Sequence, residues 1–172
     1  MTPEFSRPER ADSIGERPRA VEIAANEAER AALAQRFDLV AIDCLEAQLS
    51  VRREGGGITL TGTVSAKVVQ ACSVTDEPIA VEIEEPVALR FVESLDLGEE
   101  VELDEGALDT VAIEGGVIDL GEAAAETMAL ALDPFPRSAG AAAALKEAGV
   151  IGEDEVVPFN ALTEALKAKL GR

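Results

Sequence analysis

The side chains in this sequence that could do chemistry are two cysteines, Cys44 and Cys72, and 34 aspartates and glutamates. The sequence contains no histidine, which excludes Ser-His-Asp and Cys-His nucleophile systems, His-ligated zinc or haem, and an imidazole proton shuttle. Two cysteines are too few for a disulfide framework and cannot alone complete a four-ligand structural zinc site. We therefore expect a protein of a reducing compartment, without a cofactor or a resident metal.

Cys72 stands at the end of a predicted strand and is followed by Asp76 and Glu77. A reactive thiolate needs a nearby cation or a helix N-terminus, and negative neighbours raise the pKa of a thiol. We therefore expect Cys72 to be a packed, small apolar side chain rather than a nucleophile or metal ligand. Cys44 is expected to lie in the core as well.

The many carboxylates do not form a recognisable catalytic or metal-binding pattern. A glycosidase-type pair needs a sugar cleft, usually with aromatic platforms, and the chain has five Phe and no Trp or Tyr. The acidic run 99–105 lacks the ligand spacing of an EF-hand loop. Gly55-Gly56-Gly57 lacks the Lys-Ser/Thr of a phosphate-binding loop. The sequence predicts a protein that is not an enzyme.

The net charge of −19 is concentrated in the middle third of the chain, residues 73–136, which contain a single basic residue, Arg90. Such a segment repels a nucleic-acid backbone. Two interpretations remain open: a solvated acidic face that maintains solubility, or a docking surface for a basic protein such as a ribosomal protein or a cationic processing enzyme. Direct contact with RNA would instead use the arginines at positions 7, 10, 17, 19, 52 and 53.

No segment resembles a targeting or membrane-spanning sequence. Residues 1–19 are rich in charge and lack the apolar stretch of a signal peptide. No stretch approaches the roughly 18 apolar residues of a membrane helix. We expect a cytoplasmic protein that makes no membrane contact.

Hydrophobic periodicity predicts the main elements. Residues 1–21 are interpreted as an extended arm around an edge strand, with Phe5 and Ile14 as anchors. Asn26 and Glu29 have capping-box spacing before a helix over 27–37. Alternating apolar residues then predict a long hairpin over 42–52 and 58–68, turning at the three glycines, and a third strand over 79–91 that Pro86 interrupts.

The second half is predicted to be an acidic loop over 93–109, a strand at 111–113, and a helix over 121–132 that Asp119 caps. Further helices are expected over 139–148 and 159–170. The fold class is therefore α+β: an antiparallel β-meander or partly closed barrel flanked by N- and C-terminal helices. Residues 1–136 are predicted to form the core domain and 137–172 a helical tail.

Three motifs occur in a fixed order in this chain. They are Gln70-Ala71-Cys72-Ser73-Val74-Thr75-Asp76-Glu77-Pro78; Ile118-Asp119-Leu120-Gly121-Glu122, which leads into Leu130-Ala131-Leu132-Asp133-Pro134-Phe135-Pro136; and a closing Pro158-Phe159-Asn160-Ala161-Leu162. Together they resemble the YceD-like family of large ribosomal RNA accumulation proteins, of the alphaproteobacterial type. The resemblance implies a role in synthesis, processing or stability of large-subunit (23S) ribosomal RNA, without an established catalytic activity.

Many members of that family carry a C-x-x-C pair and later cysteines, which imply a metal- and nucleic-acid-binding module as the alternative function. In this sequence Thr75 occupies the place of the second cysteine, and no cysteine follows Leu132. The metal function is therefore not carried over to this chain. The motif residues are instead expected to serve as turns, caps, helix stops or a partner surface. They are Gln70, Cys72, Thr75, Asp76, Glu77, Pro78, Asp119, Leu120, Pro134, Pro136 and Phe159.

Overall fold

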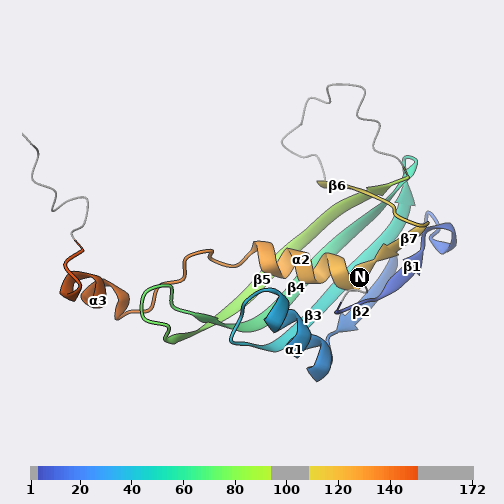
Figure 1. Cartoon of the computed structure of the whole chain (residues 1–172). Helices are drawn as coiled ribbons and strands as arrows, with labels where there is room; N and C mark the ends of the chain where they lie inside the picture. The colour runs from blue at the N-terminus through green and yellow to red at the C-terminus, as the bar shows by residue number, and fades with distance from the viewer. Residues whose placement is uncertain (1–3, 94–108, 151–172) are drawn as a thin grey trace, which may run out of the picture.

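The computed structural model describes residues 4–93 and 109–150, and its main feature is a curved five-stranded sheet (Figure 1). The strand order is β2-β3-β4-β5-β6, in which consecutive strands are neighbours. The pairs from β2 to β5 are antiparallel, whereas β6 runs parallel to β5. The five strands are β2 (Arg19–Ala24), β3 (Ala41–Glu54), β4 (Gly57–Ala71), β5 (Pro78–Val92) and β6 (Asp109–Ala112).

The predicted hairpin forms the centre of this sheet. Strands β3 and β4 pair along their whole length, from Glu54 with Gly57 to Ala41 with Val69. The positive φ angles of Gly55 and Gly56 (56° and 78°) are those that a tight hairpin turn requires, and glycine adopts them without strain. The two predicted strands and their glycine turn are therefore confirmed, while their register, with a shift between Ile42 and Cys44, comes from the structure.

Strand β5 differs from the prediction because Pro86 does not interrupt it. The strand pairs with β4 continuously from Pro78 to Phe91, and Pro86 itself lies opposite Thr63. A proline is compatible with a strand when its nitrogen faces away from the neighbouring strand, as it can at a sheet edge. The proline therefore indicated an edge strand and not a break.

The N-terminal segment is more structured than the predicted arm. Strand β1 (Pro8–Arg10) pairs with β7 (Val117–Asp119) in a separate two-stranded sheet, and a short 3-10 helix, η1 (Ala11–Ser13), follows β1. The chain then enters β2, an edge strand of the main sheet whose first residues fall within the predicted arm 1–21. The two expected anchors are confirmed, because Phe5 and Ile14 are buried.

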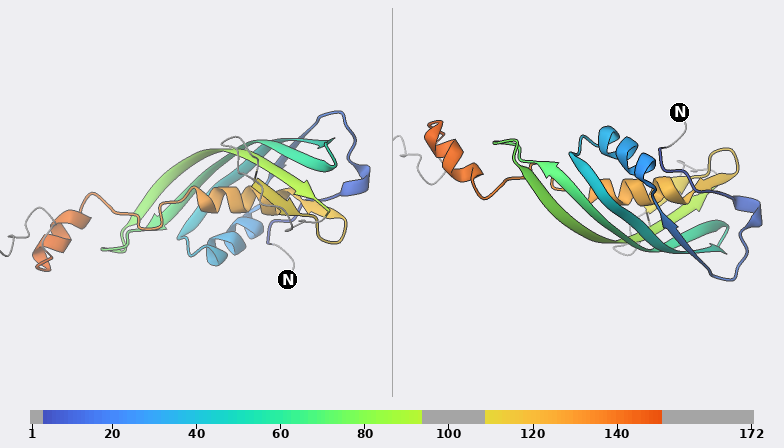
Figure 2. Two further views of the ribbon diagram at one scale, coloured as in Figure 1. Left: turned by 90° about the horizontal axis from the view of Figure 1, so that it is seen from above. Right: turned by 90° about the horizontal axis from the view of Figure 1, so that it is seen from below.

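Helices α1 (Glu27–Arg36) and α2 (Leu120–Leu130) lie against the concave face of the sheet, while α3 (Ala141–Glu147) extends beyond one end of it (Figure 2). The predicted capping box of α1 is confirmed: the Glu29 amide donates to Asn26 Oδ1, and the Asn26 amide donates to the Glu29 carboxylate. The convex face of the sheet carries no other element among the residues described.

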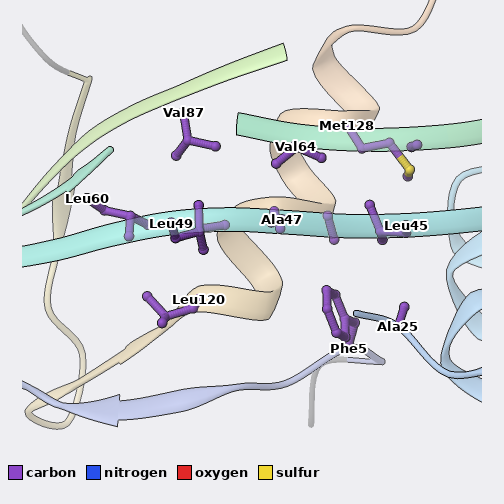
Figure 3. Packing of buried hydrophobic residues seen from close by; sticks show 14 of the residues in the cluster. Phe5, Ala25, Leu45, Ala47, Leu49, Leu60, Val64, Val87, Leu120 and Met128 are labelled. Atoms are coloured by element: carbon purple, nitrogen blue, oxygen red, sulfur yellow. The ribbon is translucent and has the colours of Figure 1, made fainter. Parts of the chain in front are cut away.

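The core lies between the concave face and the two helices. Alternate residues of β3, including Leu45, Ala47 and Leu49, share one buried cluster with Phe5 and with residues of α2 such as Leu120 and Met128 (Figure 3). Full burial of a large apolar side chain contributes about 1.5–3 kcal/mol relative to its exposed state. The N-terminal segment is therefore an integral part of the core and not an appendage.

The α+β class and the antiparallel meander are confirmed, and the sheet is not a closed barrel. The final helices shift slightly, since α2 begins at Leu120 and α3 spans Ala141–Glu147. Most of the acidic loop, residues 94–108, and the predicted helix over 159–170 lie outside the described residues. The division at residue 136 stays a prediction.

Candidate functional site

A cleft of about 470 Å³ opens at the end of the sheet where β4 passes into β5. Three segments form its walls: the turn 70–76, the connection between α1 and β3 at 37–39, and the chain at and after the end of α2. Several family-motif residues, Gln70, Cys72, Asp76, Pro134 and Pro136, therefore meet at one place although they are far apart in sequence. The lining residues are Phe37, Asp38, Leu39, Gln70, Ala71, Cys72, Ser73, Asp76, Ala129, Leu132, Asp133, Pro134 and Pro136.

The turn from Cys72 to Pro78 is held by its own backbone. The Cys72 amide donates to the Glu77 carbonyl (2.8 Å), and the Asp76 amide donates to the Cys72 carbonyl (3.0 Å). Asp76 has a φ of 56°, a left-handed conformation that aspartate tolerates better than most residues. Pro78 then begins β5 opposite Ala71. These residues thus have the turn roles that their types predict.

The segment after α2 is fastened to this turn by side-chain and backbone hydrogen bonds. Gln70, a buried polar residue, donates from Nε2 to the Asp133 carbonyl (3.0 Å). The Ser73 amide and its hydroxyl both donate to the Pro136 carbonyl (2.8 and 3.0 Å). The prolines at 134 and 136 cannot continue the helix, so the carbonyls of this segment are free to accept these bonds.

Ser138 completes the fastening and was not predicted from the sequence. Its hydroxyl donates to the Glu77 carboxylate (2.6 Å) and lies 3.3 Å from the Thr75 hydroxyl, which also contacts that carboxylate (3.0 Å). The hydrogen bonds from Ser138 and Thr75 lower the pKa of Glu77. Thr75 therefore belongs to a hydrogen-bonded cluster with Glu77 and Ser138.

The thiol of Cys72 is buried, as expected, but its electrostatic environment is the reverse of the prediction. The Ser138 amide donates to Cys72 Sγ at 3.2 Å. This amide, followed by the Thr75 hydroxyl, lowers the pKa of Cys72 to about 6. The local carboxylates were expected to raise the pKa, but these donors converge on the sulfur and favour its thiolate form.

Cys44 corrects a second expectation, because it does not lie in the core. A register shift between Ile42 and Cys44 places Cys44 opposite Lys67, with Glu46 and Glu82 nearby and a half-buried side chain. Burial raises the pKa of its thiol, and the charge of Glu46 raises it further. Both cysteines are free thiols.

The polar lining of the cleft is acidic. Asp38, Asp76 and Asp133 line it, and none of its lining residues is Lys or Arg. Apolar surface from Phe37, Leu132 and other side chains lies between these carboxylates. Such a surface suits an apolar segment that carries positive charge. Within residues 4–93 and 109–150, no group of three or more His, Cys, Asp or Glu could hold a metal ion.

The remaining motif residues lie elsewhere or outside the description. Asp119 caps α2 at its N-terminus, accepting from the Gly121 and Glu122 amides, and also accepts from the Arg7 amide (2.7 Å). Leu120 is part of the core. Both residues are structural, which confirms the predicted cap. Phe159 lies outside the described residues.

Most arginines proposed for RNA contact are already engaged with protein groups. The structure pairs Arg7 with Glu29, Arg10 with Asp12, Arg19 with Glu9 and Arg52 with Glu54, while Arg53 donates to the carbonyls of Ala11 and Ile14. Of the six, Arg17 alone has no partner within the described ranges. These arginines therefore do not form a free basic surface.

The missed residues of the site share one property: they reach it through contacts distant in sequence. Ser138 meets Cys72 across 66 positions, and Asp38 lies after α1 in a left-handed conformation (φ 55°). No local spacing connects either residue to the Cys72 turn. The two prolines preceding Ser138 were the available signal, since they predicted the end of the helix but not where the following segment packs.

The fold and the cleft define an α+β protein. Two helices cover the concave face of an open, curved sheet, and an acidic cleft lies at one end of that sheet. Residues 60–164, more than half of the chain, match the family described as Large ribosomal RNA subunit accumulation protein YceD. The chain belongs to this family, as the motif order predicted. Neither the curated proteins nor the solved structures contain a significant match. Within the described ranges, no helix has the length and apolar character needed to cross a membrane.

Proposed function

We propose that this protein is a non-catalytic factor that promotes accumulation of large-subunit ribosomal RNA by binding a basic protein partner. The membership of its family supports the role in ribosomal RNA accumulation. The mode of action is inferred from the charge distribution. A ribosomal protein or a cationic RNA-processing enzyme has the required chemistry, and both would be met in the cytoplasm.

The observation that carries the proposal is the unneutralised acidity of the surface. Between residues 73 and 136, the described part contains twelve acidic side chains and one basic side chain, Arg90. Only Glu82 and Glu122 of the twelve form ion pairs with Lys or Arg in the described ranges. Arg90 is itself occupied, since it donates to the Gly55 carbonyl (2.7 Å). Such a surface attracts cationic proteins and repels phosphate.

The alternative function, a metal-dependent nucleic-acid-binding module, receives less support. The cluster at Cys72 holds hydroxyls where a metal site needs further thiolates, and it is joined by direct hydrogen bonds. Metal analysis of protein purified without chelator tests this alternative. Stoichiometric metal that is lost in a Cys72→Ser variant would favour it over our proposal.

The proposal is tested by the ratio of large- to small-subunit ribosomal RNA in cells with and without this protein. We expect the ratio to fall on deletion and to recover with the wild-type chain or with Cys72→Ser, because the proposed function uses no thiol chemistry and a serine oxygen can also accept from the Ser138 amide. An unchanged ratio on deletion would remove the proposed function. Recovery with the wild type but not with Cys72→Ser would show that the thiol acts directly.

A further inference from the structure

Within residues 4–93 and 109–150, strand β5 has most of one backbone edge without a partner strand. It pairs with β4 over nearly its whole length, but β6 covers its other edge only from Leu89 to Val92. Among the described residues, no strand pairs with that edge before Leu89 (Figure 1). The open edge therefore comprises residues 79–88, which is longer than the average strand.

The direction of the backbone groups on this edge follows from two contacts. The Val92 carbonyl accepts from the Ile113 amide (2.7 Å), so Val92 points its backbone toward the β6 side. Alternate residues of a strand point the same way, and the even-numbered residues of β5 therefore face the open edge. Pro86, which has no amide hydrogen, is one of them, in agreement with the unbroken ladder to β4.

The side chains along this edge are acidic and exposed. Glu82 and Glu84 project from the convex face, and Glu85 projects from the other face; all three are exposed. Glu82 is paired with Lys67, whereas Glu84 and Glu85 have no basic partner among the residues described. Exposed edge strands are commonly protected by charged side chains, proline, a bulge or a cover. The charges on this edge are all negative, so they repel an acidic or neutral-to-acidic strand but attract a basic one.

Apolar side chains alternate with these carboxylates. Ile79 and Val81 lie on the concave side and are only partly buried, although Val81 packs against the core. An added strand would extend the sheet and cover these residues with its own apolar side chains. The side chains on the other face of the added strand would lie next to Glu82 and Glu84. The edge therefore favours a segment that alternates apolar and basic residues.

We propose that the open edge of β5, residues 79–88, binds an extended basic segment of the protein partner as an additional strand. This inference rests on the proposed function, because it assigns a place and a geometry to that partner. Backbone hydrogen bonds to the even-numbered residues, of which Pro86 offers only its carbonyl, would supply affinity, and the carboxylates would select positive charge.

A second copy of this chain is a poorer occupant of the edge. Two β5 edges paired around a two-fold axis would bring Glu82, Glu84 and Glu85 of both copies together, and like charges on neighbouring strands are destabilising. Concentration-independent monomer behaviour is therefore expected. A dimer that Ala80→Pro disrupts would overturn the proposal in favour of self-pairing.

Hydrogen exchange tests whether the edge is open and whether it binds. In the free protein, the amides of Glu82 and Glu84 should exchange faster than those of Val81 and Ile83, which face β4. A peptide of about eight residues that alternates Lys and Val should then protect Glu82 and Glu84 selectively. Equal protection of all four amides in the free protein would show that the edge is already covered and would overturn the proposal.

Two variants separate the backbone from the charge. Ala80→Pro removes an edge amide without changing charge or the bonds to β4, and should weaken peptide binding about tenfold. Glu84→Gln keeps the backbone amide and should weaken peptide binding about threefold. Glu126→Gln on α2 is the matched charge control and should leave peptide binding unchanged. Because the chain has no Trp, a Trp-labelled peptide reports binding directly. Equal binding by Ala80→Pro and wild type, with no amide protection, would contradict strand addition.

Ribosomal RNA in cells distinguishes this inference from the function on which it rests. If deletion lowers the large-subunit ratio and a folded Ala80→Pro fails to restore it, both stand. If Ala80→Pro restores the ratio fully, the edge proposal fails and the proposed function survives. If deletion itself has no effect, the proposed function fails. The thermal unfolding of Ala80→Pro, compared with the wild type, establishes that the variant is folded.

Discussion

The backbone amide of Ser138 lies 3.2 Å from Cys72 Sγ and donates a hydrogen bond to it. This contact joins the turn between β4 and β5 to the chain that follows α2. It also explains why a cysteine surrounded by carboxylates in sequence has a pKa lowered to about 6, since the Ser138 amide is the largest cause of the shift. The thiolate therefore acts as an acceptor that fastens two distant segments.

The first prediction concerns pH and stability. The pKa of Cys72 in the folded protein, about 6, lies below the ordinary value of 9.0. The thiolate therefore contributes its full stabilisation of the fold at pH values above 9.0. This contribution is lost as the pH falls from 9.0 through about 6. The thermal unfolding midpoint should thus rise between about pH 6 and pH 9 in the wild type more than in Cys72→Ser. Identical pH profiles would show that Cys72 is a neutral thiol.

The titration itself can be followed by thiolate absorbance near 240 nm, because the chain has no Trp or Tyr to obscure it. The wild type should show a transition with a midpoint of about 6, which Cys72→Ser abolishes, and a separate one at higher pH from Cys44, whose pKa is raised. Ser138→Pro removes the donating amide and should raise that midpoint. Ser138→Ala keeps the backbone amide and should shift the midpoint of the transition less.

The second prediction concerns the contact between the N-terminal segment and α2. A Cβ added at Gly121 would lie 2.3 Å from the Phe5 carbonyl oxygen, too close for the backbone to remain in place. Gly121→Ala should therefore lower the free energy of unfolding by about 1–3 kcal/mol in urea titrations. Gly140→Ala is the matched control, since its Cβ would make only an ordinary contact, 3.5 Å from Glu77 Oε2. Equal effects of the two substitutions would contradict this packing.

The third prediction concerns the cap of α2. Asp119→Ala removes the acceptor of the Gly121 and Glu122 amides and should destabilise the protein by about 0.5–2 kcal/mol, whereas Asp119→Asn retains an acceptor and should cost less. Equilibrium unfolding measures both. Equal costs of the two substitutions would show that the charge of Asp119, which both remove, is decisive and not its capping geometry.

The sequence predicted those parts of the fold that depend on local pattern. Asp119 and the capping box at Asn26 follow directly from residue type and spacing, as do the β3–β4 hairpin and its glycine turn. The short strands β1 and β2 lack that signal, because they exist only through pairing with distant strands. Pro86 was misleading for the same reason: its effect depends on which side of β5 has a neighbour.

The candidate site was predicted in its residues but not in its assembly. The resemblance singled out Gln70, Cys72 and Pro136, and the structure brings them to one cleft. The lowered pKa of Cys72 could not be predicted, because its principal donor is distant in sequence and the local residues suggested the opposite sign.

The fourth prediction concerns RNA. Five of the six arginines considered for RNA contact are held by carboxylates or carbonyls, and the acidic surface repels phosphate. The purified protein should show no measurable affinity for ribosomal RNA fragments at low salt. Substituting Arg17 by Gln should change nothing. Tight binding that weakens steeply with salt would contradict an indirect action on ribosomal RNA.

The central claim is that the acidic surface carries the function, and a charge-neutralised variant tests it in cells lacking the protein. Glu82→Gln, Glu84→Gln and Glu85→Gln are combined in one chain; the control combines Glu114→Gln, Glu126→Gln and Glu147→Gln, which are exposed and lie outside the open edge 79–88. The account predicts that the control restores the ratio of large- to small-subunit ribosomal RNA and that the β5 variant, folded and equally abundant, does not. Full restoration by the β5 variant would contradict the account.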